Sequence, residues 1–136
     1  MNAYISISYG KRKILDPAIC TIINTLKQFN IDPLVFVDVY QFNAKQERQM
    51  MQQAFAAIDQ CDILVAEVSD KAIGIGVEVG YAKAKGKPVV YIRHIDRNHS
   101  KTVSGVSDFH IFYIDVNDLD TQLTDIVQQL TGRVTP

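Results

Sequence analysis

Apolar residues recur along this chain at two spacings, one typical of strands and the other typical of helices. Residues 3–8 alternate between apolar and polar and are rich in β-branched types, which is typical of a strand, whereas residues 16–29 repeat apolar positions at helical spacing. Residues 62–68 are almost continuously apolar, as expected for a strand covered on both faces. By these criteria the pattern predicts strands at 3–8, 34–39, 62–68, 88–92 and 109–114, and helices at 16–30, 46–60, 76–85 and 116–130.

Strands that alternate with helices along the whole length predict an α/β fold with a parallel sheet and helices on both faces. We expect a flavodoxin-like, Rossmann-like three-layer sandwich whose five parallel strands lie in the order 2-1-3-4-5, formed by residues 1–136 as a single domain. Ligands of such sheets bind beyond the carboxyl ends of the strands. The segments 8–13, 68–78 and 93–108 should therefore surround one crevice, with 94–108 as a long irregular connection.

Composition narrows the class of protein further. The formal net charge of −1 lacks the basic excess of a domain that binds duplex nucleic acid. No apolar run approaches the roughly 18 residues of a membrane helix, and residues 1–10 read as a strand, not as a signal peptide. Two distant cysteines, Cys20 and Cys61, suggest buried thiols in a reducing compartment. We therefore expect a cytoplasmic protein.

Three glycines follow the central strand. Gly74, Gly76 and Gly80 are spaced G-x-G-x-x-x-G, which is neither the dinucleotide fingerprint nor a phosphate-binding P-loop. Gly74 and Gly76 would let the backbone approach a ligand at a helix N-terminus, where amides and the helix dipole favour an anion. Gly80 would let this helix pack closely on the sheet. A tight turn with close packing explains the same glycines without any ligand.

Glu78 is the unusual residue of this segment. The pattern places it in the first turn of the helix, close to the crevice, where the dipole favours an ionised carboxylate. The alternative is an ordinary acid on a solvated helix face. The three histidines, His94, His99 and His110, show no metal-ligand spacing, so we expect no metal site and no cofactor.

The stretch CDILVAEVS at residues 61–69, followed by GIGVEVGYAKAKGKPV at residues 74–89, resembles the nucleoside 2-deoxyribosyltransferase superfamily. It is most similar to the 2'-deoxynucleoside 5'-monophosphate N-glycosidases, and the likeness extends more weakly over most of the chain. The resemblance implies an enzyme that cleaves the N-glycosidic bond of a (deoxy)nucleoside or its 5'-monophosphate, by hydrolysis or by base transfer. It also implies that Glu78 is the nucleophile and forms a covalent glycosyl ester.

The chain departs from the family at two positions. The family's acidic partner, which assists the leaving base, aligns with Ala54, so Asp38 and Tyr40 become candidates for base or acid contacts. A serine of the family's pre-glycine loop aligns with Ala72. The missing acid leaves open a catalytically impaired protein that binds or senses nucleotides, and also a flavodoxin-like interaction domain without a nucleotide site.

The resemblance further implies where a nucleotide would bind. The phosphate would be held by the turn after the first strand, by the loop before the glycines, and by a serine of a neighbouring subunit. The serine of the neighbouring subunit aligns with Ser104, so the resemblance implies a homodimer or higher homo-oligomer in which Ser104 reaches the next site. A solvated basic turn explains residues 11–13 equally well. The binding residues expected are Ser8, Tyr9, Gly10, Lys11, Arg12, Ser69, Gly74, Gly76 and Ser104, with Tyr40 or Phe42 placed to stack a base.

Overall fold

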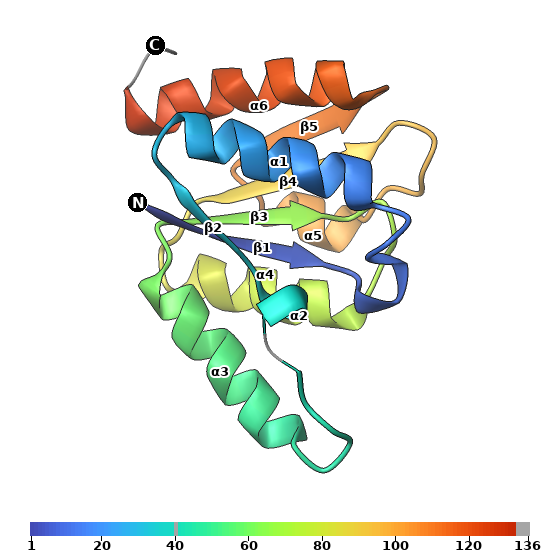
Figure 1. Ribbon diagram of the computed structural model, residues 1–136, viewed down its shortest axis with the longest axis vertical. Helices are drawn as coiled ribbons and strands as arrows, with labels where there is room; N and C mark the ends of the chain where they lie inside the picture. The colour runs from blue at the N-terminus through green and yellow to red at the C-terminus, as the bar shows by residue number, and fades with distance from the viewer. Residues whose placement is uncertain (40, 133–136) are drawn as a thin grey trace.

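The computed structural model describes residues 1–39 and 41–132 as one all-parallel sheet with helices on both faces (Figure 1). The strand order is β2-β1-β3-β4-β5, so the predicted topology is confirmed. Each strand pairs in parallel register with its neighbours, for example Tyr4 of β1 with Leu64 of β3. The strands are β1 (Asn2–Ile7), β2 (Asp32–Val35), β3 (Ile63–Glu67), β4 (Val89–His94) and β5 (Phe109–Tyr113).

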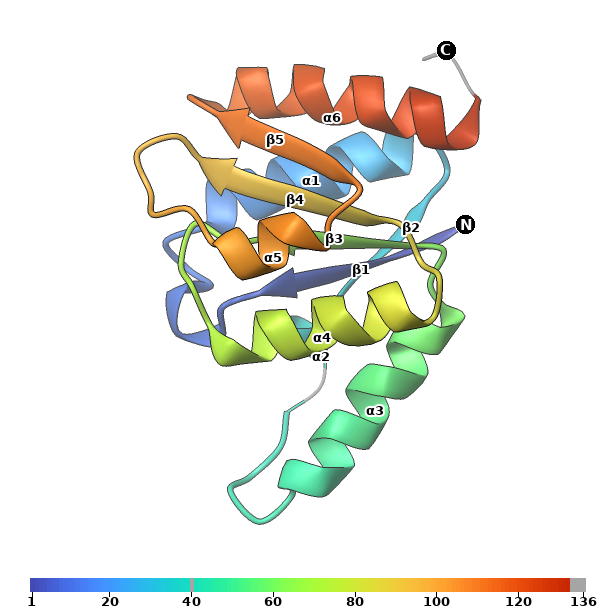
Figure 2. The ribbon, with the colours of Figure 1, turned by 180° about the vertical axis from the view of Figure 1, so that it is seen from behind.

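The helices form a layer on each side of the sheet (Figures 1 and 2). One layer consists of α1 (Asp16–Gln28) and α6 (Val116–Thr131), and the opposite layer of α3 (Glu47–Gln60), α4 (Ile73–Ala84) and α5 (Lys101–Gly105). A short 3₁₀ turn, η1 (Tyr9–Lys11), follows β1, and the one-turn helix α2 (Phe36–Val39) follows β2. In the parts of the chain described here, no helix has the length and apolar character needed to cross a membrane.

Strand alternation divides the side chains of β1 between the two layers. Ala3, Ile5 and Ile7 belong to the core that includes α1 and α6, whereas Tyr4 belongs to the core that includes α3 and α4. Because successive side chains point to opposite faces, Ser6 lies on the same face as Tyr4. This face of β1 is therefore the one that meets α4.

Two segments differ from the predicted pattern. The second strand ends at Val35, and Phe36–Val39 forms α2 instead of continuing to residue 39. The early end lets the buried Phe36 ring stack on Tyr4, with ring centroids 5.8 Å apart. The connection 94–108 contains the short helix α5, whose N-cap Ser100 accepts a hydrogen bond from the Val103 N–H.

Helix α4 begins at Ile73, earlier than the predicted start at Gly76. Its buried residues Ile75, Val79 and Ala82 face the core. Because this apolar spacing is helical, the helix extends towards its N-terminus and includes the glycines. Glu78 consequently lies beyond the first turn, contrary to the prediction. Gly80 is exposed, and a Cβ built there would meet nothing within 4 Å, so the prediction that it allows close packing on the sheet is wrong.

The two cysteines differ in exposure, although both thiols are free. Cys61 is buried beneath α3, but Cys20 lies on the exposed side of α1. The expectation of two buried thiols is therefore wrong for Cys20. The apolar face of α1 uses Ala18, Ile19 and Ile22 instead.

Candidate active site

The Glu78 carboxylate lies between α4 and β1 and is held at both oxygens. The Tyr4 hydroxyl donates a hydrogen bond to Oε2, and Ser6 Oγ donates to Oε1 at 2.9 Å. Both donors are buried and come from the face of β1 that meets α4. Two fixed donors set the orientation of the carboxylate, which is the preorganisation that a nucleophile needs.

Burial controls the ionisation of this cluster. Loss of solvent raises the pKa of Glu78 above its usual 4.5, while the hydrogen bonds from Tyr4 and Ser6 act in the opposite direction. Burial, followed by the adjacent Glu78 charge, raises the pKa of Tyr4, so its hydroxyl stays protonated and remains a donor. The helix dipole acts mainly within the first turn and therefore contributes little at Glu78.

An aromatic cavity of about 400 Å³ lies beside Phe36. The ring of Phe36 stacks on Tyr4 and, with centroids 6.2 Å apart, on Phe42. Such rings favour a flat, largely apolar group. The cavity is lined by Tyr9, Phe36, Val37, Gln41, Phe42 and Met50.

The loop between β3 and α4 is hydrogen-bonded to the residue after β1 and to the end of β4. The buried Ser8 donates from Oγ to Asp70 Oδ2 at 2.7 Å. The Ser69 hydroxyl accepts from the His94 N–H at 2.8 Å, and its carbonyl accepts from Arg97 Nε at 3.1 Å. Ser8 and Ser69, both expected to bind a nucleotide, thus have their hydroxyl groups already engaged by protein groups, and Ser69 lines a cavity on the α1 and α6 side of the sheet.

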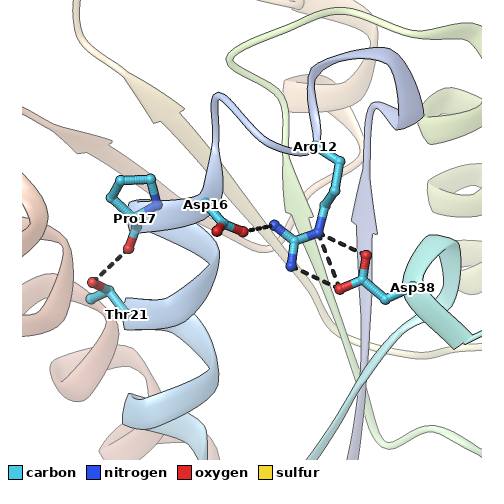
Figure 3. Close-up of polar contacts among 5 residues, drawn as sticks. All are labelled: Arg12, Asp16, Pro17, Thr21 and Asp38. Carbon is cyan, nitrogen blue, oxygen red and sulfur yellow. Dashed lines mark hydrogen bonds and ion pairs between the residues drawn. The ribbon is translucent and has the colours of Figure 1, made fainter.

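Arg12 lies between two carboxylates (Figure 3). Its Nε and Nη2 bind Asp38 at 2.7 to 3.1 Å, and its Nη1 binds Asp16. Asp16 is not the N-cap of α1, which is Leu15; it occupies the first helical position and pairs with Arg12 instead. The candidate phosphate ligand Arg12 and the candidate acid Asp38 therefore bind each other. Tyr40 lies outside the described residues.

Other candidate residues occupy different surroundings. Ala54 is buried among apolar side chains that include Val79, so no polar group stands at this position. Lys11 and Gly10 are exposed in η1. Ser104 is half-buried in α5, on the same side of the sheet as α4, and its carbonyl contacts His110 Nε2 at 2.9 Å. Its contact with a neighbouring subunit stays a prediction.

Tyr4, Ser6 and Asp70 were not predicted from the sequence. One signal for the first two was available, because Tyr4, Ser6 and Ser8 place polar groups at every second position of a strand that is buried on both faces. Such strands are normally apolar throughout, so polar groups on one face mark a site. Asp70 carried no comparable signal, since an acid in a loop is ordinary.

A second carboxylate, which is fully buried, lies at the opposite face of the sheet. Glu67 accepts from the Ser69 N–H at 2.6 Å and from the Tyr113 hydroxyl at 2.7 Å. Burial raises its pKa, against these hydrogen bonds. A cavity of about 420 Å³ between α1 and α6 lies beside Tyr113, His94 and Arg97. Glu67 thus anchors the Ser69 loop from the face that Glu78 does not occupy.

The family of the chain follows from the fold, the site and a sequence comparison together. The parallel sheet and the glycine-containing helix with the part-buried Glu78 agree with the resemblance seen in the sequence. The family model described as nucleoside 2-deoxyribosyltransferase matches residues 16–127. The chain belongs to this family, as the resemblance implied. The match begins after β1, so Tyr4 and Ser6 lie outside it.

Two curated relatives are named as 2'-deoxynucleoside 5'-phosphate N-hydrolases. The protein from Thermofilum pendens is 27% identical over 89 residues, which cover 64% of this chain and 62% of the relative. The protein from Syntrophotalea carbinolica is 45% identical over 38 residues, or 28% of this chain and 27% of the relative. The matched segments therefore span less than two thirds of each relative.

Solved structures confirm the fold. The CMP N-glycosidase of Clostridium botulinum has a TM-score of 0.64 at 19% identity, with 90% of this chain and 98% of that chain covered. The 2-deoxyribosyltransferase of Bacillus psychrosaccharolyticus has a TM-score of 0.68 at 14% identity, with 88% and 90% covered. At these identities the likeness concerns the arrangement of the elements.

Proposed function

We propose that this protein cleaves the N-glycosidic bond of a (deoxy)nucleoside or its 5'-monophosphate through a covalent intermediate on Glu78. The observation that carries the proposal is the part-buried Glu78 carboxylate, oriented by Tyr4 and Ser6, together with an aromatic cavity lined by Phe36, whose ring stacks on Tyr4. Membership of the nucleoside 2-deoxyribosyltransferase family supports the reaction class. The names of the curated relatives support a 5'-phosphorylated deoxynucleoside as one candidate substrate.

The chemistry has two steps. A Glu78 oxygen attacks C1' of the sugar as the bond from C1' to the base nitrogen breaks, and the base takes the electron pair and a proton. The charge that develops on the sugar in the transition state is stabilised by the same carboxylate. Water, or the nitrogen of a second base, then attacks C1' and releases Glu78. Hydrolysis and base transfer differ only in this second step.

The aromatic cavity is the proposed place of the base. Tyr9, Phe36 and Phe42 offer ring surfaces beside the Glu78 cluster, and a heteroaromatic base stacks favourably on such rings. Ala54 cannot donate a proton, and Asp38 is paired with Arg12. We therefore assign the proton of the leaving base to water. Bases that leave readily should react faster than bases that need strong acid assistance.

Free-base release tests the proposal. Chromatography measures release from a panel of nucleosides and 5'-monophosphates by the wild type and by Glu78→Gln, which keeps the shape and removes the nucleophile. We expect the wild type to release free base and the variant to release it at least about a thousandfold more slowly. After acid quenching, the wild-type peptide that contains Glu78 should carry a sugar adduct. Equal release by both proteins contradicts the role of Glu78.

The second candidate function is nucleotide binding or sensing without turnover. The observation that favours it is Ala54, which leaves an apolar side chain where the family has an acid. A protein of this kind gains thermal stability from a bound nucleotide but releases no base. Oligomerisation through Ser104, a cytoplasmic location and the single-domain organisation stay predictions under either function.

A further inference from the structure

The cavity between α1 and α6 lies on the face of the sheet opposite to Glu78. Its volume is about 420 Å³, and its lining comes from the starts of α1 and α6 and from the segments that follow β3, β4 and β5. Ala18 and Tyr113 of this lining belong to the core on the α1 side, whereas Glu78 contacts Tyr4 of the other core. Cavities of this size hold small molecules. An inference about this cavity therefore does not depend on the proposed reaction.

Much of the lining is apolar and open to solvent. Ile14 is 69% exposed, Ile114 61% and Val116 38%, so three of the large apolar side chains that the molecule leaves exposed gather at this one cavity. Leu15 and Ala18 continue this lining towards the core. Single exposed apolar residues are ordinary, but a group of them around a cavity indicates a surface that a ligand covers. The body of the ligand should therefore be apolar.

Two side chains of opposite charge line the same cavity without pairing to each other. Asp96 and Arg97 are consecutive and exposed, and in the described part of the chain neither takes part in an ion pair. Arg97 Nε donates to the Ser69 carbonyl oxygen at 3.1 Å, and this contact leaves the two Nη groups for a ligand. The other acid of the lining, Asp115, accepts from the Asp118 N–H at the start of α6. The charges available to a ligand are thus one cation and one anion.

Hydrogen bonds fix the loop that carries these two charges. Arg93 Nη1 donates to three carbonyl oxygens of this loop, that of Arg97 among them. His94 Nδ1 accepts from the Asp96 N–H, so Nε2 carries the ring proton and donates to the Ile114 carbonyl oxygen at 3.2 Å. Asp96 and Arg97 therefore project from a fixed turn, which reduces the conformational entropy that is lost when a ligand binds.

We propose that this cavity binds a free α-amino acid with an apolar side chain, such as leucine. The carboxylate of the amino acid pairs with the two Nη groups of Arg97, whose planar guanidinium matches a carboxylate. The ammonium group pairs with Asp96, and the side chain covers the exposed apolar lining. A carboxylate without the ammonium group leaves Asp96 facing an anion, and a phosphate dianion is repelled by this acid more strongly. The opposite charges of the lining therefore favour a zwitterion.

Methyl NMR spectroscopy tests the site, because Ile14 and Ile114 report contact with a ligand directly. Three matched probes are titrated: leucine, isocaproate, which lacks the ammonium group, and isoamylamine, which lacks the carboxylate. We expect leucine at millimolar or lower concentration to cause saturable shifts of both isoleucine signals. The other two probes should bind at least about fivefold more weakly, since each loses one charged contact.

Variants that remove one charge assign each group of the ligand. Arg97→Gln should weaken the binding of leucine at least about fivefold and leave that of isoamylamine no weaker. Asp96→Asn should weaken leucine similarly and leave isocaproate no weaker. Arg48→Gln on α3 and Asp125→Asn on α6 remove exposed charges outside the cavity and should leave all three affinities unchanged.

Three results overturn the proposal. The first is the absence of shifts at Ile14 and Ile114 with millimolar leucine, and the second is a leucine affinity that Arg97→Gln and Asp96→Asn both leave unchanged. The third is tighter binding of isocaproate, or of a nucleoside, than of leucine, which would assign the cavity to simple carboxylates or to the substrate. None of these measurements requires turnover, so failure here leaves the proposed reaction of Glu78 standing.

Discussion

Tyr4 is the residue on which the ionisation of Glu78 depends most directly. Its hydroxyl donates to the carboxylate and thereby opposes the rise in pKa that burial causes. Tyr4→Phe keeps the ring stacked on Phe36 but removes the donor. A hydrogen bond to a charged group contributes about 1.5–3 kcal/mol, equivalent to roughly ten- to hundredfold in rate. We expect kcat/KM to fall by that factor at low pH, with the acid limb of the pH–rate profile displaced to higher pH.

Tyr113→Phe is the matched control for this prediction. It removes a buried hydroxyl that donates to Glu67 instead, on the opposite face of the sheet. Its acid limb should coincide with that of the wild type. A Tyr4→Phe profile that is lowered equally at every pH would mean that the hydroxyl does not act through the ionisation of Glu78.

At the residue scale, the sequence singled out Glu78 as a candidate but did not predict the side chains that surround it. Glu78 was identifiable because its spacing from Gly74 and Gly76 belongs to a family pattern. Tyr4 lies 74 residues away from it along the chain, and Ser8 lies 62 residues from Asp70. Side-chain pairs at such separations are decided by strand register, which a pattern of apolar positions does not specify to a single residue.

At the scale of elements, α4 offers a test of why its glycines are there. A Cβ on Gly76 or on Gly80 would meet nothing within 4 Å of protein. Alanine in a helix interior is more stable than glycine by roughly 0.5–1 kcal/mol. Both Gly76→Ala and Gly80→Ala should therefore raise Tm by a few degrees. Calorimetry of the two variants measures this gain.

The two variants should differ in activity. Gly76 lies two residues before Glu78, nearer the N-terminal end of α4 where a ligand is expected, whereas Gly80 lies on the exposed part of the helix. An added methyl group at position 76 should lower kcat/KM by about tenfold or more through contact with substrate. Equal activity of the two variants would mean that Gly76 leaves no room that a substrate uses.

The boundaries of the elements were harder to predict than their kinds. Five strands and four helices follow from the spacing of apolar residues, yet β2 ends early and α4 begins early. In both cases a tertiary contact overrides the local pattern. Phe36 turns inward to stack on Tyr4, and Ile75 and Val79 bury against the sheet.

At the scale of the whole molecule, the alternation of strands and helices was enough to predict the topology. A right-handed crossover after each strand leaves few parallel arrangements, and the observed order is one of them. The order then brings the ends of β1 and β3 together, where Glu78 and Asp70 lie. What could not be predicted is that a carboxylate lies against each face of the sheet, Glu67 from β3 and the part-buried Glu78 from α4, since this depends on which face each strand and helix position takes.

These two carboxylates give the molecule a characteristic dependence of stability on pH. Glu67 and Glu78 both have folded-state pKa values raised above 4.5 by burial. The folded protein therefore binds more protons than the unfolded chain just above that pH, so its stability falls as the pH rises. Their contribution is fully present below about pH 4.5 and is lost as the pH passes their folded pKa values.

Glu67→Gln should reduce the loss of folding stability that occurs as the pH rises. The amide oxygen still accepts from the Ser69 N–H, and the Tyr113 hydroxyl can accept from the amide nitrogen, so the packing is kept while the charge is absent. We expect Tm to fall less between pH 4 and pH 8 than in the wild type, with a gain of a few degrees at pH 8.

For Asp108→Asn, the change in stability relative to the wild type should depend on pH in the opposite direction. Burial acts to raise the pKa of Asp108, but the Val89 N–H and Lys83 outweigh it and lower that pKa. Removing this charge therefore costs stability above about pH 4 and least in acid. A Glu67→Gln curve parallel to that of the wild type would show that Glu67 is ionised as readily in the folded protein as in the unfolded chain.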